Sequence, residues 1–234
     1  MFLYPNLLAV SEQTTQTVKW VSVAGIIVLL AVIACIGYFS KEQKASAKEL
    51  AFAGICIALS FTLSVLKVKI FASGGSITFG AFVPIMLYAF VFGPTKGFLV
   101  GLIHGLLNFI ESPYILSAAT FVFDYLLAFL GVGIMGFFGK MPREKRAALP
   151  LVLGAVCVIA VRFTAHLCSG AIFFEAFGPD LAFPSWAVSN AWSYSFLYQC
   201  TYVPIDGAIA IVILVILCKT GVLDHLIKIM RSAK

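Results

Sequence analysis

The sequence predicts an all-α membrane protein that crosses the bilayer seven times. Of its 234 residues, 62% are hydrophobic and 11% are charged, and the mean hydropathy is +1.05. A soluble domain is typically about 45–50% apolar and about 25% charged, and a domain of this size cannot bury so much apolar surface. The composition therefore excludes a soluble enzyme, a nucleic-acid-binding protein and a disordered chain. A transmembrane β-barrel is excluded because the apolar stretches are continuous and do not alternate.

The first half of the chain contains four candidate spans. A spanning helix needs about 20 largely apolar residues, and the candidate stretches run from Val18 to Phe39, Leu50 to Phe71, Ile77 to Phe92 and Gly97 to Ile110. The last two are short and are separated by a turn signal of glycine and proline. The first resembles a signal sequence, with a lipoprotein-like box ending at Cys35. We favour a spanning helix, because no Lys or Arg precedes Lys19 and the apolar run has full length.

The second half contains three more spans, from Ile115 to Phe138, Leu149 to Phe174 and Ala187 to Cys218. The last is long enough to cross the bilayer with tilt. These spans predict an extracellular segment (1–17), an extra transmembrane helix (18–39), a cytoplasmic linker (40–49), a six-helix domain (50–218) and a cytoplasmic basic tail (219–234).

The positions of the basic residues predict the orientation in the membrane. Of the 16 Lys and Arg residues, twelve fall in alternate connections, namely Lys41, Lys44, Lys48, Lys96, Lys140, Arg143, Lys145, Arg146, Lys219, Lys228, Arg231 and Lys234. The opposite side carries only Lys19, Lys67 and Lys69. Cytoplasmic loops carry an excess of Lys and Arg. We therefore expect the N-terminus outside and the C-terminus in the cytoplasm.

The motifs of several catalytic and metal-binding classes are missing from the sequence. The six cysteines form no C-x-x-C pair, so neither a metal site nor a redox pair is indicated. There is no phosphate loop of the G-x-x-x-x-G-K-[ST] type. We expect no cofactor, and the chain cannot hydrolyse ATP by itself in the P-loop manner.

Five ionisable residues lie inside the predicted spans, where such groups are costly and usually functional. They are His104, Asp124, Arg162, His166 and Asp206. Arg162 and His166 are four residues apart and share one helix face. Arg162 neutralises either Asp206 or Asp124 as a structural pair, and His104 is open to a bond with a neighbouring helix. Asp124 is followed by Tyr125, which favours a ligand-contacting role for this carboxylate.

Aromatic and amide side chains cluster near these groups in the sequence. Tyr114 lies ten residues before Asp124, so the two can line one cavity from different depths. Tyr194 and Gln199 are five residues apart and can border one pocket from its two edges. Aromatic faces attract cations, and a carboxylate accepts hydrogen bonds from an aminopyrimidine-type edge. The expected ligand is small, flat, nitrogen-rich and cationic.

Ordered motifs across residues 50–218 carry a family resemblance. They are Phe92-Gly-Pro-Thr-Lys-Gly-Phe98, Gly101-Leu-Ile-His-Gly-Leu-Leu107, Tyr114-Ile-Leu-Ser117, Phe123-Asp-Tyr-Leu-Leu-Ala-Phe129 with Gly133, Arg162-Phe-Thr-Ala-His166 with Ser169-Gly170 and Phe173-Phe174, and Tyr194-Ser-Phe-Leu-Tyr-Gln199. The chain resembles the membrane-embedded substrate-binding (S) components of energy-coupling factor (ECF) vitamin transporters, of the thiamine-specific type.

The resemblance implies a six-helix bundle that binds thiamine near the extracellular face and has no enzymatic activity of its own. It implies a transmembrane coupling subunit and two cytoplasmic ATPase subunits as partners, no nucleic acid, and a location in the lipid bilayer of a bacterial cell membrane. By position, the thiamine site is implied to comprise Tyr114, Asp124, Tyr125, His166, Phe174, Tyr194 and Gln199. A small-residue face at Ala51, Gly54 and Ala58 is implied to contact the coupling subunit; ordinary packing inside the bundle is the alternative.

Several departures from the family pattern leave alternatives open. Residue 124 is Asp where the family commonly has Glu, residue 199 is Gln where Asn is usual, and the first span is additional to six helices. A different small, pyrimidine-like or vitamin ligand is therefore an alternative. A self-sufficient secondary transporter is another, although inverted repeats and broken helices are not evident. An intramembrane enzyme is disfavoured because no nucleophile–base or metal motif is present.

Overall fold

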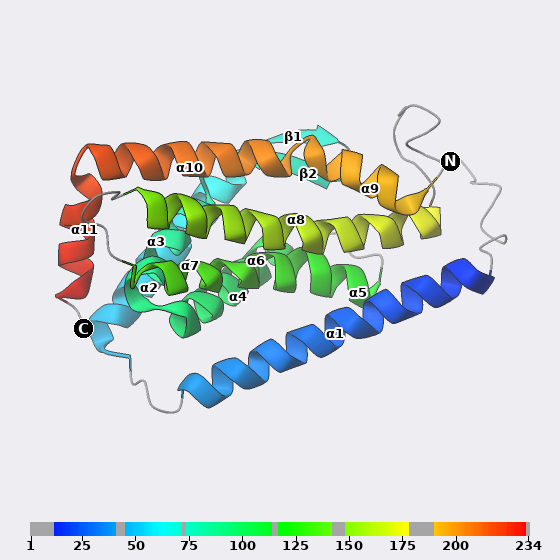
Figure 1. The fold of residues 1–234 in the computed structure, drawn as a ribbon, viewed down its shortest axis with the longest axis horizontal. Helices are drawn as coiled ribbons and strands as arrows, with labels where there is room; N and C mark the ends of the chain where they lie inside the picture. Colours follow the sequence, from blue (N-terminus) through cyan, green and yellow to red (C-terminus); the bar gives the residue numbers. More distant parts are fainter. Residues whose placement is uncertain are drawn as a thin grey trace.

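The computed structural model describes the chain over residues 12–40, 45–71, 74–113, 117–141, 148–177 and 190–232. Long helices and one two-stranded hairpin make up this part of the chain (Figure 1). Four helical segments are long and apolar enough to cross a membrane, namely Ala47–Val65, Ala118–Phe138, Leu149–Ile172 and Ala191–Lys219. Trp20–Ala31 and Phe82–Phe92 are shorter apolar helices. The chain is thus a multi-pass helical membrane protein, and the count of seven spans stays a prediction.

Local sequence signals mark the starts of the first bundle helices. Helix α2 (Ala47–Val65) begins with a capping box, in which Ser46 Oγ accepts the Glu49 N–H and the Glu49 carboxylate accepts the Ser46 N–H. Helix α3 (Phe82–Phe92) is buried along its whole length. Gly93, with a φ of 96°, turns the chain sharply into α4 (Pro94–Glu111). Pro94 suits the start of this helix, because the backbone N–H that proline lacks would have no partner in the first turn.

A hairpin occupies the stretch in which the sequence predicted the end of the second span and the start of the third. Strands β1 (Lys67–Phe71) and β2 (Gly74–Thr78) pair antiparallel, with Lys67 opposite Thr78. The prediction that the second span continues to Phe71 and the third begins at Ile77 is therefore wrong. Lys67 and Lys69 alternate with apolar residues, which is the period of a strand. Their charges are also costly within a bilayer, so the helix ends before them.

The next membrane segment is one helical run with changes of winding. It comprises α5 (Ala118–Phe121), a π-helical turn η1 (Val122–Leu127), α6 (Ala128–Leu130), a 3₁₀ turn η2 (Gly131–Ile134) and α7 (Met135–Phe138). Gly101 and Gly105 of α4 lie against the carbonyl groups of Phe129 and Tyr125, where a Cβ atom would collide. The absence of side chains at these two positions lets α4 approach the backbone of the irregular run.

The predicted last span consists of two helices. After α8 (Leu149–Phe177), the chain forms α9 (Ala191–Cys200) and α10 (Val203–Lys219), separated by Thr201 and Tyr202. Pro204 lies in the first turn of α10, and a proline this near the junction prevents one continuous helix because it cannot donate a backbone hydrogen bond. The break was not predicted.

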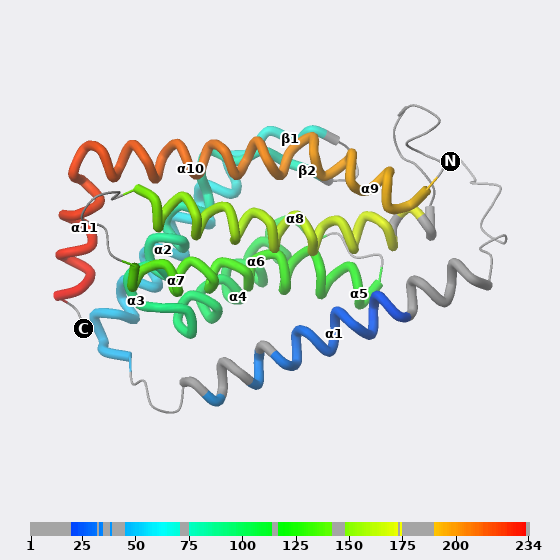
Figure 2. Tube along the Cα trace, in the orientation of Figure 1, coloured from blue at the N-terminus to red at the C-terminus, as the bar shows by residue number. Residues whose placement is uncertain are grey.

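Part of the predicted basic tail is the amphipathic helix α11 (Val222–Arg231). Gly221, with a φ of 75°, precedes it. Leu223, Ile227 and Met230 face the core, while Lys228 and Arg231 are exposed. Helix α11 lies across one end of the bundle, and α9 and the hairpin lie toward the other end (Figure 2). Helix α1 (Glu12–Ser40) runs obliquely along the side of the bundle (Figure 1).

Candidate ligand-binding site

A cavity of about 220 Å³ lies among the hairpin, α4, η1, α8 and α9. Polar, charged and aromatic groups supply most of its lining, which comprises Ser64, Lys67, Gly75, Ser76, Thr78, Ala81, Phe82, His104, Asn108, Glu111, Ser112, Asp124, Tyr125, Phe129, Arg162, His166, Ser169, Gly170, Tyr194, Tyr198, Gln199 and Tyr202. The elements that border it place the cavity toward the end of the bundle opposite α11 (Figure 1).

Asp124 links the π-helical turn to α8. Its Oδ1 atom lies 2.8 Å from His166 Nδ1, and its Oδ2 atom accepts a hydrogen bond of 2.5 Å from Ser169 Oγ. A carboxylate accepts from the Nδ1–H of a histidine, which leaves Nε2 of a neutral ring as an acceptor. His166 Nε2 is buried and has no hydrogen-bond partner within the described chain. The pair therefore offers two acceptor groups to a ligand that carries N–H donors.

Gln199 joins α9 to the same part of α8. Its Nε2 atom donates to the His166 carbonyl oxygen at 3.1 Å, and its Oε1 atom accepts from the Tyr202 hydroxyl. A Cβ atom at Gly170 would lie 3.0 Å from Gln199 Nε2, so the glycine gives the amide room to reach α8. These contacts hold the Gln199 amide in one orientation beside His166.

Tyrosine rings form the α9 wall of the cavity. The centroids of Tyr194 and Tyr198 are 6.1 Å apart, and those of Tyr198 and Tyr202 are 6.0 Å apart. Tyr125 contributes from η1, and its hydroxyl donates to the Ser112 carbonyl oxygen at 2.7 Å. Such ring faces provide favourable electrostatics for a cation.

A second buried carboxylate is fully occupied by protein donors. Asp206 Oδ1 accepts from the backbone N–H and hydroxyl of Thr78 at 2.8 and 2.6 Å, and Oδ2 pairs with Arg162 Nη1. The Arg162 guanidinium also lies 4.4 Å from the centroid of the Phe82 ring. Of the two acids that the sequence offered as partners of Arg162, the structure selects Asp206.

His104 bonds within its own helix and not to a neighbouring one. Its Nε2 atom is 2.9 Å from Asn108 Nδ2, and its Nδ1 atom is buried without a partner in the described structure.

At the rim, Lys67 on β1 and Glu111 on α4 form an ion pair of 2.5 Å. Asn108, Lys67 and Thr78 were absent from the predicted site. The alternation of charged and apolar residues around Lys67 was the sequence signal that could have predicted a strand here, and with it the contribution of the hairpin to the cavity.

Five of the seven predicted site residues line this one cavity, namely Asp124, Tyr125, His166, Tyr194 and Gln199. Phe174 does not line it; its ring packs on Tyr194, with centroids 5.1 Å apart. Tyr114 lies outside the described residues. In the part of the chain that the structure describes, no three His, Cys, Asp or Glu side chains are grouped to hold a metal ion.

The predicted docking residues lie on the outer surface of the bundle. Ala51, Gly54 and Ala58 of α2 are all exposed, and a Cβ atom at Gly54 would meet no other atom within 4 Å. Internal packing therefore does not account for the small side chains at these positions.

Comparisons with known proteins agree on one family. A family model described as Thiamine transporter protein (Thia_YuaJ) matches residues 50–223. Thiamine transporter ThiT of Bacillus subtilis (strain 168) is 31% identical over 156 residues, which represent 63% of this chain and 77% of the relative. The solved structure of ThiT from Listeria monocytogenes has a TM-score of 0.63 and 25% identity, covering 74% of this chain and 94% of that chain.

Proposed function

The chain belongs to the thiamine transporter protein family, and from this premise we propose that it captures thiamine in the cavity around Asp124. In this proposal it is the S component of an ECF-type importer. It takes up the vitamin on the outer side and delivers it together with a transmembrane coupling subunit and two cytoplasmic ATPase subunits. The chain itself catalyses no reaction.

The observation that carries the proposal is the convergence of complementary groups on one cavity. Asp124 and the unpartnered Nε2 atom of His166 are acceptors for the N–H groups of the amino substituent of an aminopyrimidine. The tyrosine faces along α9 suit the positively charged ring of thiamine. Ionisable residues inside membrane spans are costly and often functional, and the Asp124–His166 pair lines the cavity.

The exposed small-residue face of α2 supports the proposed contact with a coupling subunit. Membrane helices approach one another closely where small residues recur four positions apart, as Gly54 and Ala58 do. Both residues are exposed in the isolated chain. A partner helix therefore has access to this face without displacing another part of the bundle.

The deciding experiment is a thiamine titration of the purified full chain and of Asp124→Asn. The asparagine keeps the shape and removes the charge, so the affinity is expected to fall about tenfold to hundredfold. Asp224→Asn, at an exposed position of α11, is the matched control and should bind like the wild type. Equal thiamine affinity in Asp124→Asn and the wild type would refute the site.

A second candidate, an S component for another pyrimidine-like vitamin, is favoured by the details of the polar groups. The carboxylate of Asp124 sits on a shorter side chain than the glutamate common in the family, and both ends of the Gln199 amide are engaged by protein groups. Titration of the wild-type protein against a panel of vitamins separates the two candidates. Tighter binding of another vitamin than of thiamine would select the second.

A further inference from the structure

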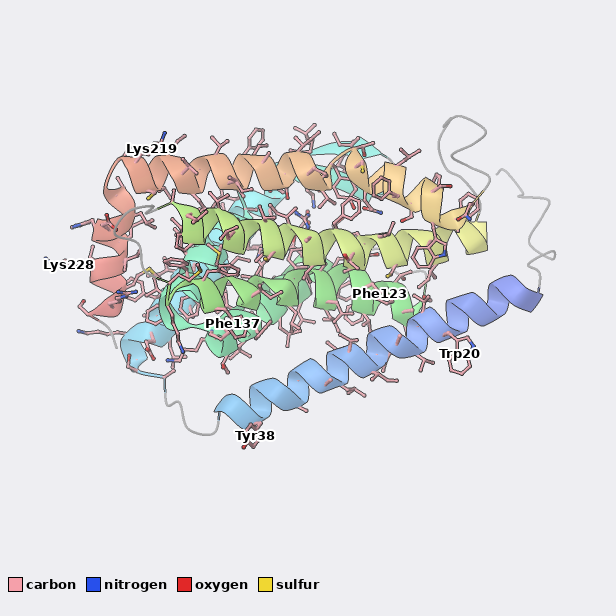
Figure 3. All side chains as sticks on the ribbon, in the orientation of Figure 1. Trp20, Tyr38, Phe123, Phe137, Lys219 and Lys228 are labelled. Carbon is pink, nitrogen blue, oxygen red and sulfur yellow. The ribbon has the colours of Figure 1, made fainter. Side chains whose placement is uncertain are left out.

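Helix α1 is additional to the part of the chain that the family model matches, which begins at residue 50. It nevertheless packs against α4, α5, η1 and α8, and η1 carries Asp124. Trp20 and Tyr38 on α1 point away from the bundle (Figure 3) and are 69% and 71% exposed. Helix α1 therefore has one face toward the binding domain and another toward its surroundings.

The inner face of α1 is defined by residues four positions apart. Gly25 and Leu29 are buried, and Val21 packs on the core cluster. At the same depth, Ile27 and Leu30 are 60% and 59% exposed. Residues spaced by four lie on one side of a helix, so α1 is held against the bundle by a narrow strip.

The closest approach in this strip is between Gly25 and the ring of Phe123. A Cβ atom at position 25 would lie 2.5 Å from Phe123 Cζ and 2.8 Å from Cε2. Any side chain at Gly25 must therefore displace the ring or the helix. The Phe123 side chain is only 7% exposed, so the ring is enclosed and has little freedom to move aside.

Phe123 immediately precedes Asp124 within the π-helical turn Val122–Leu127. A π-helical turn is a rare winding that occurs mostly as a short insertion at functional sites. Here it presents the Asp124 carboxylate to His166 and Ser169 on α8. A shift of the Phe123 backbone would be transmitted to these two hydrogen bonds through a single peptide unit.

We propose that α1 is a positioning element of the binding site, which holds the π-helical turn in place through the contact between Gly25 and Phe123. None of the described side chains of α1 is among the residues that line the cavity. Its effect on ligand affinity is exerted through the orientation of Asp124. The expected change in thiamine affinity rests on the proposed function, whereas the contact between Gly25 and Phe123 does not.

The test compares two leucine substitutions in the full-length protein. Gly25→Leu should bind thiamine about tenfold more weakly, because an overpacked contact is relieved by moving the turn. Ala24→Leu is the matched control, since Ala24 is the preceding residue and is exposed. Its affinity should stay within about twofold of the wild type. Hydrogen–deuterium exchange of residues 122–127 should rise in Gly25→Leu and stay unchanged in Ala24→Leu.

A second substitution separates positioning from general stability. Phe123→Ala removes the ring that Gly25→Leu meets, so the double variant should bind more tightly than the product of the two single losses predicts. If Gly25→Leu is not recovered as folded protein, Gly25→Ala takes its place. A lower melting temperature with thiamine affinity and exchange equal to the wild type would overturn the proposal. Absence of thiamine binding by the wild type would instead overturn the proposed function, and the exchange measurement would still test the contact.

Discussion

At the residue scale, the burial of the two carboxylates Asp124 and Asp206 distinguishes their roles. The Asp206 side chain is 2% exposed, and its oxygen atoms accept from Thr78 and Arg162. The Asp124 side chain is 25% exposed and itself lines the cavity, whereas Asp206 is not among the lining residues. Asp206 therefore stabilises the contact of the hairpin with α8 and α10, and Asp124 is the carboxylate that a ligand can reach.

Replacing Asp206 by Ala is expected to destabilise the protein strongly. The change leaves the Arg162 charge buried without its counter-ion, and removal of one partner of a buried pair costs about 3–5 kcal/mol. Thermal unfolding in detergent measures the effect as a lower melting temperature. The double variant Asp206→Ala, Arg162→Met removes both charges and should melt above the single variant. A single variant that melts with the wild type would contradict the structural role of this pair.

At the scale of the elements, irregular backbone surrounds the cavity. The hairpin, the π-helical turn and the break between α9 and α10 each border it. Irregular backbone is tolerated at membrane depth where protein buries it or where it lines a cavity. Regular helices such as α8 supply the rigid partner for the π-helical turn, through His166 and Ser169. The irregular elements thus border the cavity, and the regular helix α8 holds the π-helical turn beside it.

The proposed docking face of α2 makes a prediction at this scale. Gly54→Leu and Ala58→Trp each add bulk to an exposed helix surface. Thiamine binding by the isolated chain should be unchanged, whereas association with the coupling subunit and thiamine uptake should be lost. A pull-down beside a binding titration on the same proteins measures both properties.

Ala208→Leu is the matched control for these two variants, because Ala208 is also exposed and belongs to a different helix, α10. It should retain both association and uptake. Normal uptake by both α2 variants would discard the docking role. Loss of binding and association together would indicate that this face supports the fold of the chain itself.

At the scale of the whole molecule, the two ends of the bundle differ in chemistry. The end with the hairpin and α9 borders the cavity, and the opposite end carries α11 with the exposed residues Lys219 and Lys228 (Figure 3). Near α11, Lys96 pairs with Glu49 at 2.8 Å. The basic residues predict that the end with α11 faces the cytoplasm, and the cavity is then expected toward the outside.

Cysteine labelling tests this orientation. In a background without the native cysteines, Lys69→Cys on β1 should react with an impermeant thiol reagent added to intact cells, because the hairpin is expected outside. Ser232→Cys, after α11, should react only once the cells are permeabilised. The background protein without an added cysteine controls for non-specific reaction. The reverse labelling pattern would refute the proposed orientation.

Much of the site could be predicted from the sequence because charge inside an apolar span is conspicuous. This criterion identified Asp124 and His166, together with His104, Arg162 and Asp206. Sequence spacing suggested that Tyr194 and Gln199 border one pocket, and the family resemblance joined Asp124, Tyr125, His166, Tyr194 and Gln199 in one site. The cavity lining from Lys67 and Thr78 was missed, because an apolar run with two lysines was taken as the end of a helix. Phe174 was expected in the site, but it is not among the residues that line the cavity, and its ring packs on Tyr194.

Composition and the lengths of the apolar runs by themselves determined that this chain is a helical membrane protein, because each bilayer crossing must satisfy its own backbone. Tertiary structure alone decided which carboxylate pairs with Arg162, where the helices give way to the hairpin and the π-helical turn, and how Gly25 meets Phe123. The spacing of apolar residues along the sequence indicates which face of each single helix is buried, one segment at a time. Ion pairs and close contacts join residues far apart in the sequence, and they depend on how those faces meet in the packed bundle.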